Sequence, residues 1–275
     1  MKYIFIAGLE HSGSTLLNHL LCQHADAVGL GEVASFFNPE HMKTYMQRWG
    51  AYSDVRLCSC GRPWESCQIW KDLHGLNGMV SEEPLREKYR KLLQHFALRY
   101  PDLKLIVDSS KSFPVMSLIV ENAKGLGLQL EDLLVVVAVK DVRSFTASIV
   151  AKEKREHSLL FALRTFNWWA GGNRRFLDYL SGRVSHSIVL YEHLCLHPEE
   201  VVSQIYSRVG LEPGRRVDLN HSNSHIAMGN KEFIMRNRNT IRYDDRWRKN
   251  RRINAVYRFH VGARRLNEAL HASMA

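Results

Sequence analysis

The 275-residue chain contains neither a long hydrophobic run nor a leader-like start. A membrane-spanning helix needs about 18 or more consecutive apolar residues, and no stretch of this sequence approaches that length. A signal peptide would place a charged start before an apolar core and a small-residue cleavage site, whereas here a strand-like sequence follows Met1-Lys2 directly. We therefore expect a soluble protein without a transmembrane segment, located in the cytoplasm.

Cysteine is scarce, and the five cysteines do not suggest a disulfide framework, because their number is odd and no secretory leader is present. Three of them lie close together in the sequence, at Cys58, Cys60 and Cys67. Zinc usually takes four protein ligands, and only the distant His74 offers a fourth one here. Reduced thiols, a disulfide within this segment and a structural zinc ion all stay open, with reduced thiols favoured. We expect the activity to require no metal.

Repeats, low-complexity tracts and interdomain linkers are also missing, so we expect one domain over residues 1–275. With 45% hydrophobic residues, a chain of this length can bury a sizeable core. We expect an irregular insertion at about 38–73 and a basic segment at about 231–275. The net charge is +10, and residues 231–265 hold twelve Lys or Arg against three Asp or Glu. This excess of positive charge favours a role toward an anion.

Apolar runs of strand length alternate with segments of helical spacing along most of the chain. The expected strands lie at residues 3–7, 28–33, 104–108, 133–139 and 187–192. The longer expected helices lie at residues 84–100, 114–124, 158–180, 198–209 and 253–271. Runs that are apolar throughout, such as 133–139, are typical of parallel strands covered on both faces. The alternation predicts an α/β fold with a doubly wound, mainly parallel sheet flanked by helices.

The first 20 residues form the most informative motif. An apolar strand leads into a turn bounded by Gly8 and Gly13, and leucines at helical spacing follow the turn. The spacing is that of a P-loop, in which backbone N–H groups and the start of a helix hold phosphate. Ser14 stands where the P-loop lysine normally reaches the β- and γ-phosphates. The motif therefore predicts a phosphate-bearing nucleotide and argues against an ordinary ATPase or kinase.

Polar residues follow each of the five expected strands. They lie at positions 8–14, 32, 108–111, 140–148 and 191–192. Ligands of doubly wound sheets bind beyond the carboxyl ends of the strands. We therefore expect these positions to meet in one site.

The order of these motifs resembles that of sulfotransferases that use 3′-phosphoadenosine-5′-phosphosulfate (PAPS). The loop at residues 10–17 resembles the family's 5′-phosphosulfate loop, which is a P-loop without the lysine. Residues 140–143, with Ser148 eight residues after Lys140, resemble the family's 3′-phosphate element. The resemblance runs from residue 3 to about residue 247 and implies the P-loop-like sulfotransferase fold, with PAPS as the co-substrate.

Further similarities point to bacterial members of that family. Residues 107–111 resemble a strand-end segment of those members, and so does the segment from Cys58 to Trp70. Residues 225–231 resemble the late loop that closes over the nucleotide. The residues that the resemblance assigns to the co-substrate are Ser12, Gly13, Ser14, Thr15, Lys140, Arg143, Ser148, Tyr191, Gly229, Asn230 and Lys231. Within this set, Lys140 and Ser148 would grip the 3′-phosphate.

Three further residues are expected to carry the chemistry. Glu32 would take the proton from the acceptor, a hydroxyl or amine of a glycan, lipid or small molecule. His11 and Lys111 would stabilise charge on the bridging oxygen as it leaves. His11 departs from the family pattern, which has arginine or lysine there, so it would act only as a cation or a hydrogen-bond donor. We therefore expect activity to fall as the pH rises.

Two other functions are compatible with parts of the sequence. A P-loop-like nucleotide or small-molecule kinase would need a carboxylate for magnesium, and Asp108 is the candidate, although we favour a helix-capping role for it. A non-enzymatic nucleic-acid-binding protein would use the basic segment and bind in a salt-dependent manner. We expect an acceptor molecule as the partner and no specific nucleic acid, and a homodimer stays open.

Overall fold

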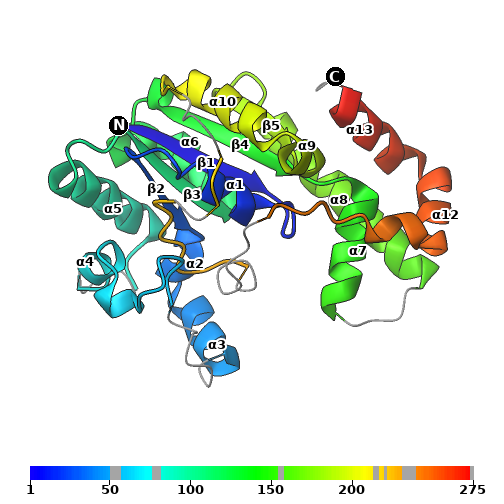
Figure 1. Cartoon of the computed structure of the whole chain (residues 1–275), viewed down its shortest axis with the longest axis horizontal. Coiled ribbons are helices and arrows are strands. Elements are labelled where there is room, and N and C mark those ends of the chain that lie inside the picture. Colours follow the sequence, from blue (N-terminus) through cyan, green and yellow to red (C-terminus); the bar gives the residue numbers. More distant parts are fainter. Residues whose placement is uncertain are drawn as a thin grey trace.

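The computed structural model describes residues 1–49, 57–75, 82–153, 158–212, 217–219, 222–230 and 240–272. Its centre is a sheet in which all neighbouring strands run parallel (Figure 1). The strands are β1 (Lys2–Gly8), β2 (Ala27–Gly31), β3 (Leu105–Lys111), β4 (Leu133–Val139) and β5 (His186–Leu190). Their order is β2-β3-β1-β4-β5, so the chain fills one side of β1 and then the other. This change of direction marks the end of β1 as the place for a ligand.

Alternating side chains of β1 enter two separate hydrophobic cores. Tyr3 and Phe5 face the first core, while Ile4 and Ile6 face the second, and all four are fully buried. Burial on both faces requires helices on both sides of the sheet. β4 is buried along its whole length, as its apolar sequence predicts. The prediction of a doubly wound, parallel α/β fold is confirmed.

Helices extend each core over one face of the sheet. The first core includes side chains of α2 (Val33–Phe37), α5 (Leu85–Arg99), α6 (Phe113–Leu126), α7 (Val142–Glu153), α8 (Leu159–Leu180), α12 (Arg251–Phe259) and α13 (Val261–Ala272). The second core includes side chains of α1 (Ser14–Leu20), α9 (Tyr191–Leu196) and α10 (Pro198–Val209). The remaining elements are α3 (Pro39–Trp49), α4 (Trp70–Gly75) and the short turns η1 (Trp64–Ser66), η2 (Leu130–Asp132) and η3 (Arg246–Lys249). No helix in the described ranges is long and apolar enough to cross a membrane.

Two segments differ from their expected secondary structure. Residues 38–73 are not irregular throughout, because α3, η1 and the start of α4 lie within them. The single helix predicted over 253–271 is wrong, since α12 and α13 are separated at His260. The Nδ1 atom of His260 accepts a hydrogen bond of 3.2 Å from the N–H of Ala263 and so caps the start of α13. Histidine is not one of the residues that usually cap helices, so the break has no clear sequence signal.

The C-terminal helices fold back onto the body of the protein. In Figure 1, α12 and α13, coloured orange and red, lie beside α7 and α8. Asn267 of α13 donates a hydrogen bond of 3.0 Å to the Asp141 carboxylate and accepts one of 2.9 Å from the N–H of Val142. The described part of the basic segment is therefore packed against the loop that follows β4 and is not a free tail.

Candidate active site

The loop between β1 and α1 depends on two glycines. Gly8 and Gly13 have φ angles of 139° and 88°, a region in which other residues are strained. A Cβ atom on Gly13 would lie 2.6 Å from the Cδ2 atom of Tyr191, so the ring of Tyr191 packs directly on the loop. The Oγ atom of Ser12 is buried in this loop and has no hydrogen-bond partner among the described residues. A buried hydroxyl without a partner is costly, and a bound phosphate oxygen would satisfy it.

His11 lies in the same loop with a φ angle of 63°, which is uncommon for a residue other than glycine. Burial and the positive charges of Lys152, Lys140 and Lys111 together lower the pKa of His11 to about 4, although the negative charge of Glu10 acts in the opposite direction. The imidazole is therefore neutral at neutral pH. Of the two roles expected for His11, a neutral imidazole can fill only that of hydrogen-bond donor, and a pKa of about 4 places its deprotonation well below neutral pH.

Glu32 and Lys111 meet at the ends of neighbouring strands. Glu32 follows β2, Lys111 ends β3, and the Nζ atom of Lys111 donates a hydrogen bond to the Glu32 carboxylate. Lys111 has a φ angle of 62°, so its backbone adopts a strained conformation that turns the chain out of the strand. Both residues line a cavity of about 980 Å³. The structure thus brings the predicted base and one predicted cation together at an open space.

The late loop connects this pair with the P-loop. The N–H of Glu32 donates a hydrogen bond of 3.2 Å to the carbonyl of Met228. The N–H of Asn230 donates a hydrogen bond of 3.5 Å to the Thr15 hydroxyl. A Cβ atom on Gly229 would lie 3.4 Å from the Thr15 hydroxyl oxygen and 3.8 Å from a Glu32 carboxylate oxygen. Thr15, Glu32, Gly229 and Asn230 are therefore neighbours, as expected, while Lys231 lies outside the described residues.

Lys140 and Ser148 lie together on the other side of β1. The Lys140 Nζ atom donates a hydrogen bond of 3.0 Å to the Ser148 hydroxyl and lies 4.1 Å from the centre of the Tyr191 ring. The Lys140 side chain is 5% exposed, and this burial lowers its pKa although Asp244 and Glu192 act in the opposite direction. Such a buried lysine needs a negatively charged partner.

That partner is Asp244, which the sequence analysis missed. A carboxylate oxygen of Asp244 lies 3.6 Å from Lys140 Nζ and accepts a hydrogen bond of 3.2 Å from the Ser148 hydroxyl. The Arg246 guanidinium donates two further hydrogen bonds of 2.7 Å to the same carboxylate. Burial alone would raise the pKa of Asp244, but Arg246 and Lys140 outweigh it and lower the pKa to about 2. A carboxylate therefore occupies the space between the two residues expected to bind the 3′-phosphate.

Arg143 is placed differently from the other residues of its motif. Its guanidinium donates hydrogen bonds of 2.9 Å and 2.6 Å to Asp141. It also stacks against Trp247 and Tyr257, whose ring centres lie 3.9 Å and 4.3 Å away. Although burial alone would raise it, the pKa of Asp141 is lowered by the hydrogen bonds and charge of Arg143. In the described contacts Arg143 anchors the C-terminal segment and does not join Lys140 and Ser148.

Glu192 is a second buried carboxyl group that the sequence did not single out. One of its carboxylate oxygens accepts a hydrogen bond of 3.1 Å from the N–H of Asp141, and the other has no partner among the described residues. Burial raises the pKa of Glu192 to about 7, and the negative charge of Asp141 adds to this effect. Glu192 therefore gains or loses its proton near neutral pH.

Asp108 has a structural position inside the sheet. It is fully buried in β3, and its carboxylate accepts hydrogen bonds of 2.8 Å from both Tyr3 and Tyr89. It also accepts bonds from the N–H and hydroxyl of Ser110, at 2.8 Å and 2.5 Å. The expectation that Asp108 caps the following helix is wrong, because Ser112 holds the N-cap position of α6. Enclosed by four donors, the carboxylate is also not free to bind magnesium.

Comparisons with known proteins agree with this fold. The sequence profile described as the sulfotransferase family matches residues 3–214. A comparison with curated protein sequences finds no match. Among solved structures, a sulfotransferase domain of the olefin synthase of Synechococcus PCC 7002 superimposes with a TM-score of 0.55 and 18% identity, covering 90% of this chain and 86% of that one.

Two further solved structures have the same fold. The sulfotransferase domain from the curacin biosynthetic pathway has a TM-score of 0.51 and 17% identity, covering 94% of this chain and 96% of its own. A sulfotransferase from Alicyclobacillus acidocaldarius has a TM-score of 0.51 and 15% identity, covering 98% of this chain and 96% of its own. Together with the family profile, which spans most of the sequence, these similarities show that the chain belongs to the sulfotransferase family.

Proposed function

We propose that this protein transfers a sulfuryl group from PAPS to a hydroxyl or amine of an acceptor by in-line displacement. One observation carries the proposal: the Tyr191 ring contacts both Gly13 of the P-loop and the ammonium group of Lys140. Tyr191 thus joins a phosphate loop to a second, separate group of residues suited to an anion. A nucleotide with phosphate at both its 5′ and 3′ positions matches this arrangement, whereas AMP and ATP carry no 3′-phosphate.

The residues at the 3′ end fit a phosphate. The Asp244 carboxylate accepts a hydrogen bond from Ser148 and neutralises Lys140, and these contacts support a site for a negatively charged oxygen group. A 3′-phosphate that replaced Asp244 would receive hydrogen bonds from the same two side chains. The Lys140 charge would remain neutralised, so the exchange would not leave a buried charge without a partner.

The residues at the 5′ end fit a phosphosulfate. Ser12 to Thr15 would hold this group through their backbone N–H groups and hydroxyls, including the unpartnered Ser12 hydroxyl. When bound, PAPS supplies the sulfuryl group and leaves as adenosine 3′,5′-bisphosphate. The transferred group carries one negative charge where a phosphoryl group carries two, so Ser14 in place of the P-loop lysine is compatible with transfer, and we propose that no magnesium clamp is required. Neutral His11, as a donor, and Lys111 would stabilise charge on the bridging oxygen.

Glu32 would act as the general base. Its carboxylate lies at the cavity wall, where it can accept the proton of an acceptor hydroxyl or amine. The ion pair with Lys111 holds the Glu32 side chain in this position before the acceptor binds. Lys111 would then serve both groups, by orienting the base and by stabilising the leaving oxygen. Such pre-set positioning is a major source of rate enhancement in group transfer.

The cavity gives the acceptor a partly apolar environment. Its volume of about 980 Å³ lies at the upper end of the range for small-molecule pockets. Apolar side chains that line it are Phe37, Phe113, Val115, Trp168 and Phe176. Lys88 and Arg175 add positive charge to the wall, and Glu10, Glu82 and Glu83 add negative charge. We propose an acceptor with an apolar body and a terminal hydroxyl or amine, a description that lipids and many small molecules meet.

Calorimetric titration of the purified protein tests the donor assignment. We expect adenosine 3′,5′-bisphosphate to bind at least about 10-fold more tightly than AMP, because only the former reaches Lys140 and Ser148 with a phosphate (about 1.4 kcal/mol or more). Magnesium-ATP serves as the comparison for the kinase alternative. Magnesium-dependent ATP binding that is tighter than bisphosphate binding would contradict the proposal.

A further inference from the structure

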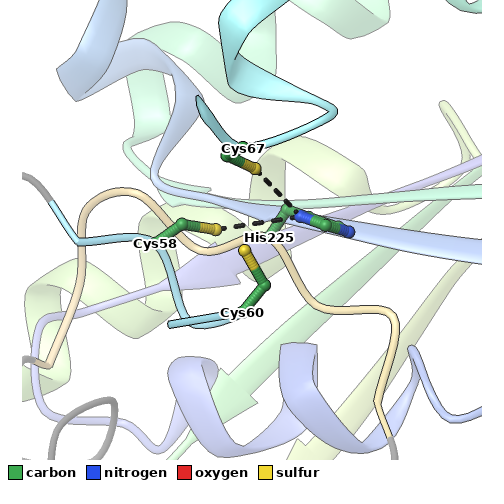
Figure 2. Close-up of side chains that lie close together, drawn as sticks. All are labelled: Cys58, Cys60, Cys67 and His225. Atoms are coloured by element: carbon green, nitrogen blue, oxygen red, sulfur yellow. Dashed lines mark hydrogen bonds between the residues drawn. The ribbon is translucent and has the colours of Figure 1, made fainter. Parts of the chain in front are cut away.

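Three cysteines and one histidine converge outside the site described above. Ligand atoms of Cys58, Cys60, Cys67 and His225, which we call the Cys3His cluster, all lie within 4.8 Å of one another. Figure 2 shows the three sulfur atoms pointing toward the His225 ring. The Nδ1 atom of His225 lies 3.1 Å from the Cys67 sulfur and 3.8 Å from the Cys58 sulfur. A tetrahedral zinc ion with Zn–S of about 2.3 Å and Zn–N of about 2.0 Å would separate such ligands by about 3.5–3.8 Å.

A tight turn presents the first two cysteines. The N–H of Cys58 donates a hydrogen bond of 2.9 Å to the carbonyl of Arg62, and the N–H of Gly61 donates one of 2.9 Å to the carbonyl of Cys58. Gly61 has a φ angle of 79°, which a glycine adopts without strain. The turn brings the Cys58 and Cys60 sulfurs to the same side of the chain, toward Cys67.

Hydrogen bonds from three directions fix the backbone of His225. Its N–H donates a bond of 2.6 Å to the carbonyl of Gly29. Its carbonyl accepts one of 2.5 Å from the indole N–H of Trp70. Ser59, between the two cysteines of the turn, donates a bond of 2.6 Å to the Ser224 carbonyl and accepts one of 2.8 Å from the N–H of Ile226. The imidazole is therefore held beside the sulfurs by contacts that do not involve its own ring.

We propose that Cys58, Cys60, Cys67 and His225 bind one structural zinc ion. Thiolate and imidazole ligands in tetrahedral geometry suit zinc, whereas magnesium and calcium prefer oxygen ligands. Binding replaces three thiol protons by one Zn²⁺, so the cluster with neutral His225 has a net charge of −1. Four protein ligands leave no position for water, which is the pattern of a structural site.

This site would connect two distant parts of the chain. Cys58, Cys60 and Cys67 belong to the insertion, while His225 begins the loop that carries Gly229 and Asn230 to the P-loop. A zinc ion would thus fix the insertion against the loop that borders the proposed active site. The metal assignment itself does not rest on the proposed function. It differs from the favoured interpretation of three reduced thiols, and it replaces His74 with His225 as the candidate for the fourth ligand; the His74 side chain lies outside the described part of the structure.

The first test measures metal in the full-length protein purified from zinc-supplemented medium. We expect one zinc ion per chain by elemental analysis, and an intact native mass equal to the chain plus one zinc minus the displaced protons. A metal-free protein would overturn the proposal, whether its mass shows all thiols reduced or shows the loss of two hydrogens that marks a disulfide. Because no donor or acceptor is present, failure here leaves the proposed sulfuryl transfer untouched.

Variants then locate the zinc. Cys60 is exposed, so Cys60→Ser should fold, as judged by circular dichroism, and bind zinc at least about 100-fold more weakly. Cys22 is buried outside the cluster, and Cys22→Ala should keep one zinc ion per chain. Replacing zinc with cobalt should give sulfur-to-cobalt charge transfer and the strong visible bands of tetrahedral cobalt. Retention of zinc by Cys60→Ser, or a cobalt spectrum without sulfur charge transfer, would overturn the assignment.

Discussion

Two lysine–carboxylate pairs lie on either side of β1, and they differ in the origin of the carboxylate. Lys111 pairs with Glu32 from an adjacent strand end, next to the cavity. Lys140 pairs with Asp244, which comes from the basic segment 96 residues beyond Ser148. The Lys140 side chain is 5% exposed and that of Lys111 13%, so the lysine of the second pair is the less exposed of the two.

The two carboxylates have different roles in our proposal: Glu32 takes part in the reaction, whereas Asp244 is displaced by the co-substrate. In our proposal Glu32 must remain beside Lys111, because it receives the acceptor proton there. Asp244 must leave Lys140 when the co-substrate binds, because the Asp244 carboxylate and the 3′-phosphate would occupy the same space. Similar ion pairs therefore have opposite consequences when they are broken, and substitutions can test this difference.

Removing the Glu32 carboxylate should have the largest effect, and this effect should be on kcat. We expect Glu32→Gln to lower kcat for sulfuryl transfer about 10²–10⁴-fold, because the amide cannot accept the proton. Affinity for adenosine 3′,5′-bisphosphate should stay unchanged. The measurement is transfer from labelled PAPS to an acceptor found by screening, with Glu121→Gln as the control, since Glu121 is exposed and contacts Tyr179 outside the site. Wild-type kcat in Glu32→Gln would exclude Glu32 as the base.

Displacing the Tyr191 ring should weaken the connection between the P-loop and Lys140. We expect Gly13→Ala to weaken bisphosphate binding about 100-fold, because its Cβ would displace Tyr191 from between the P-loop and Lys140. Gly125→Ala is the matched control, because Gly125 lies in α6 with open space around its Cβ position. That control should be stabilised by about 0.5–1 kcal/mol. Equal bisphosphate affinity in the two variants would show that Tyr191 does not couple the sides.

A smaller effect concerns Glu192, whose protonation should change the free energy of unfolding with pH. The pKa of Glu192 is raised from 4.5 to about 7, so the folded state holds this proton more tightly than the unfolded chain. The resulting stabilisation is complete below about pH 4.5 and is lost as the pH rises through 7. We expect Glu192→Gln to gain about 1–3 kcal/mol relative to wild type between pH 5 and pH 8 in denaturant unfolding. Exposed Glu199→Gln should show no such pH-dependent gain, and a similar gain there would refute the assignment.

Local patterns explain how much of the fold could be predicted. The all-apolar run at 133–139 forms β4 with the expected ends, and the helix predicted at 198–209 forms α10 with the expected ends. The spacing of Gly8 and Gly13 predicts a turn between a strand and a helix, and the structure has this turn between β1 and α1. In each case the signal lies within about a dozen consecutive residues, where apolar periodicity and turn residues determine the local structure.

The parts that could not be predicted depend on contacts between distant residues. His225 reaches Cys67 across 158 residues, and Asp244 reaches Ser148 across 96. Nothing in the spacing of these residues indicates such contacts, because the path of the intervening chain decides them. The stacking of Arg143 on Trp247 could not be predicted for the same reason, because it depends on how the C-terminal segment returns to the sheet.

The most direct test of the account is calorimetric titration of adenosine 3′,5′-bisphosphate into Asp244→Asn, beside Lys140→Ala and wild type. We predict opposite shifts: Asp244→Asn should bind roughly tenfold more tightly, because the competing charge is gone, and Lys140→Ala about 100-fold more weakly. Circular dichroism should show that both variants remain folded. Weaker or unchanged binding in Asp244→Asn would contradict the claim that this carboxylate occupies the place of the 3′-phosphate.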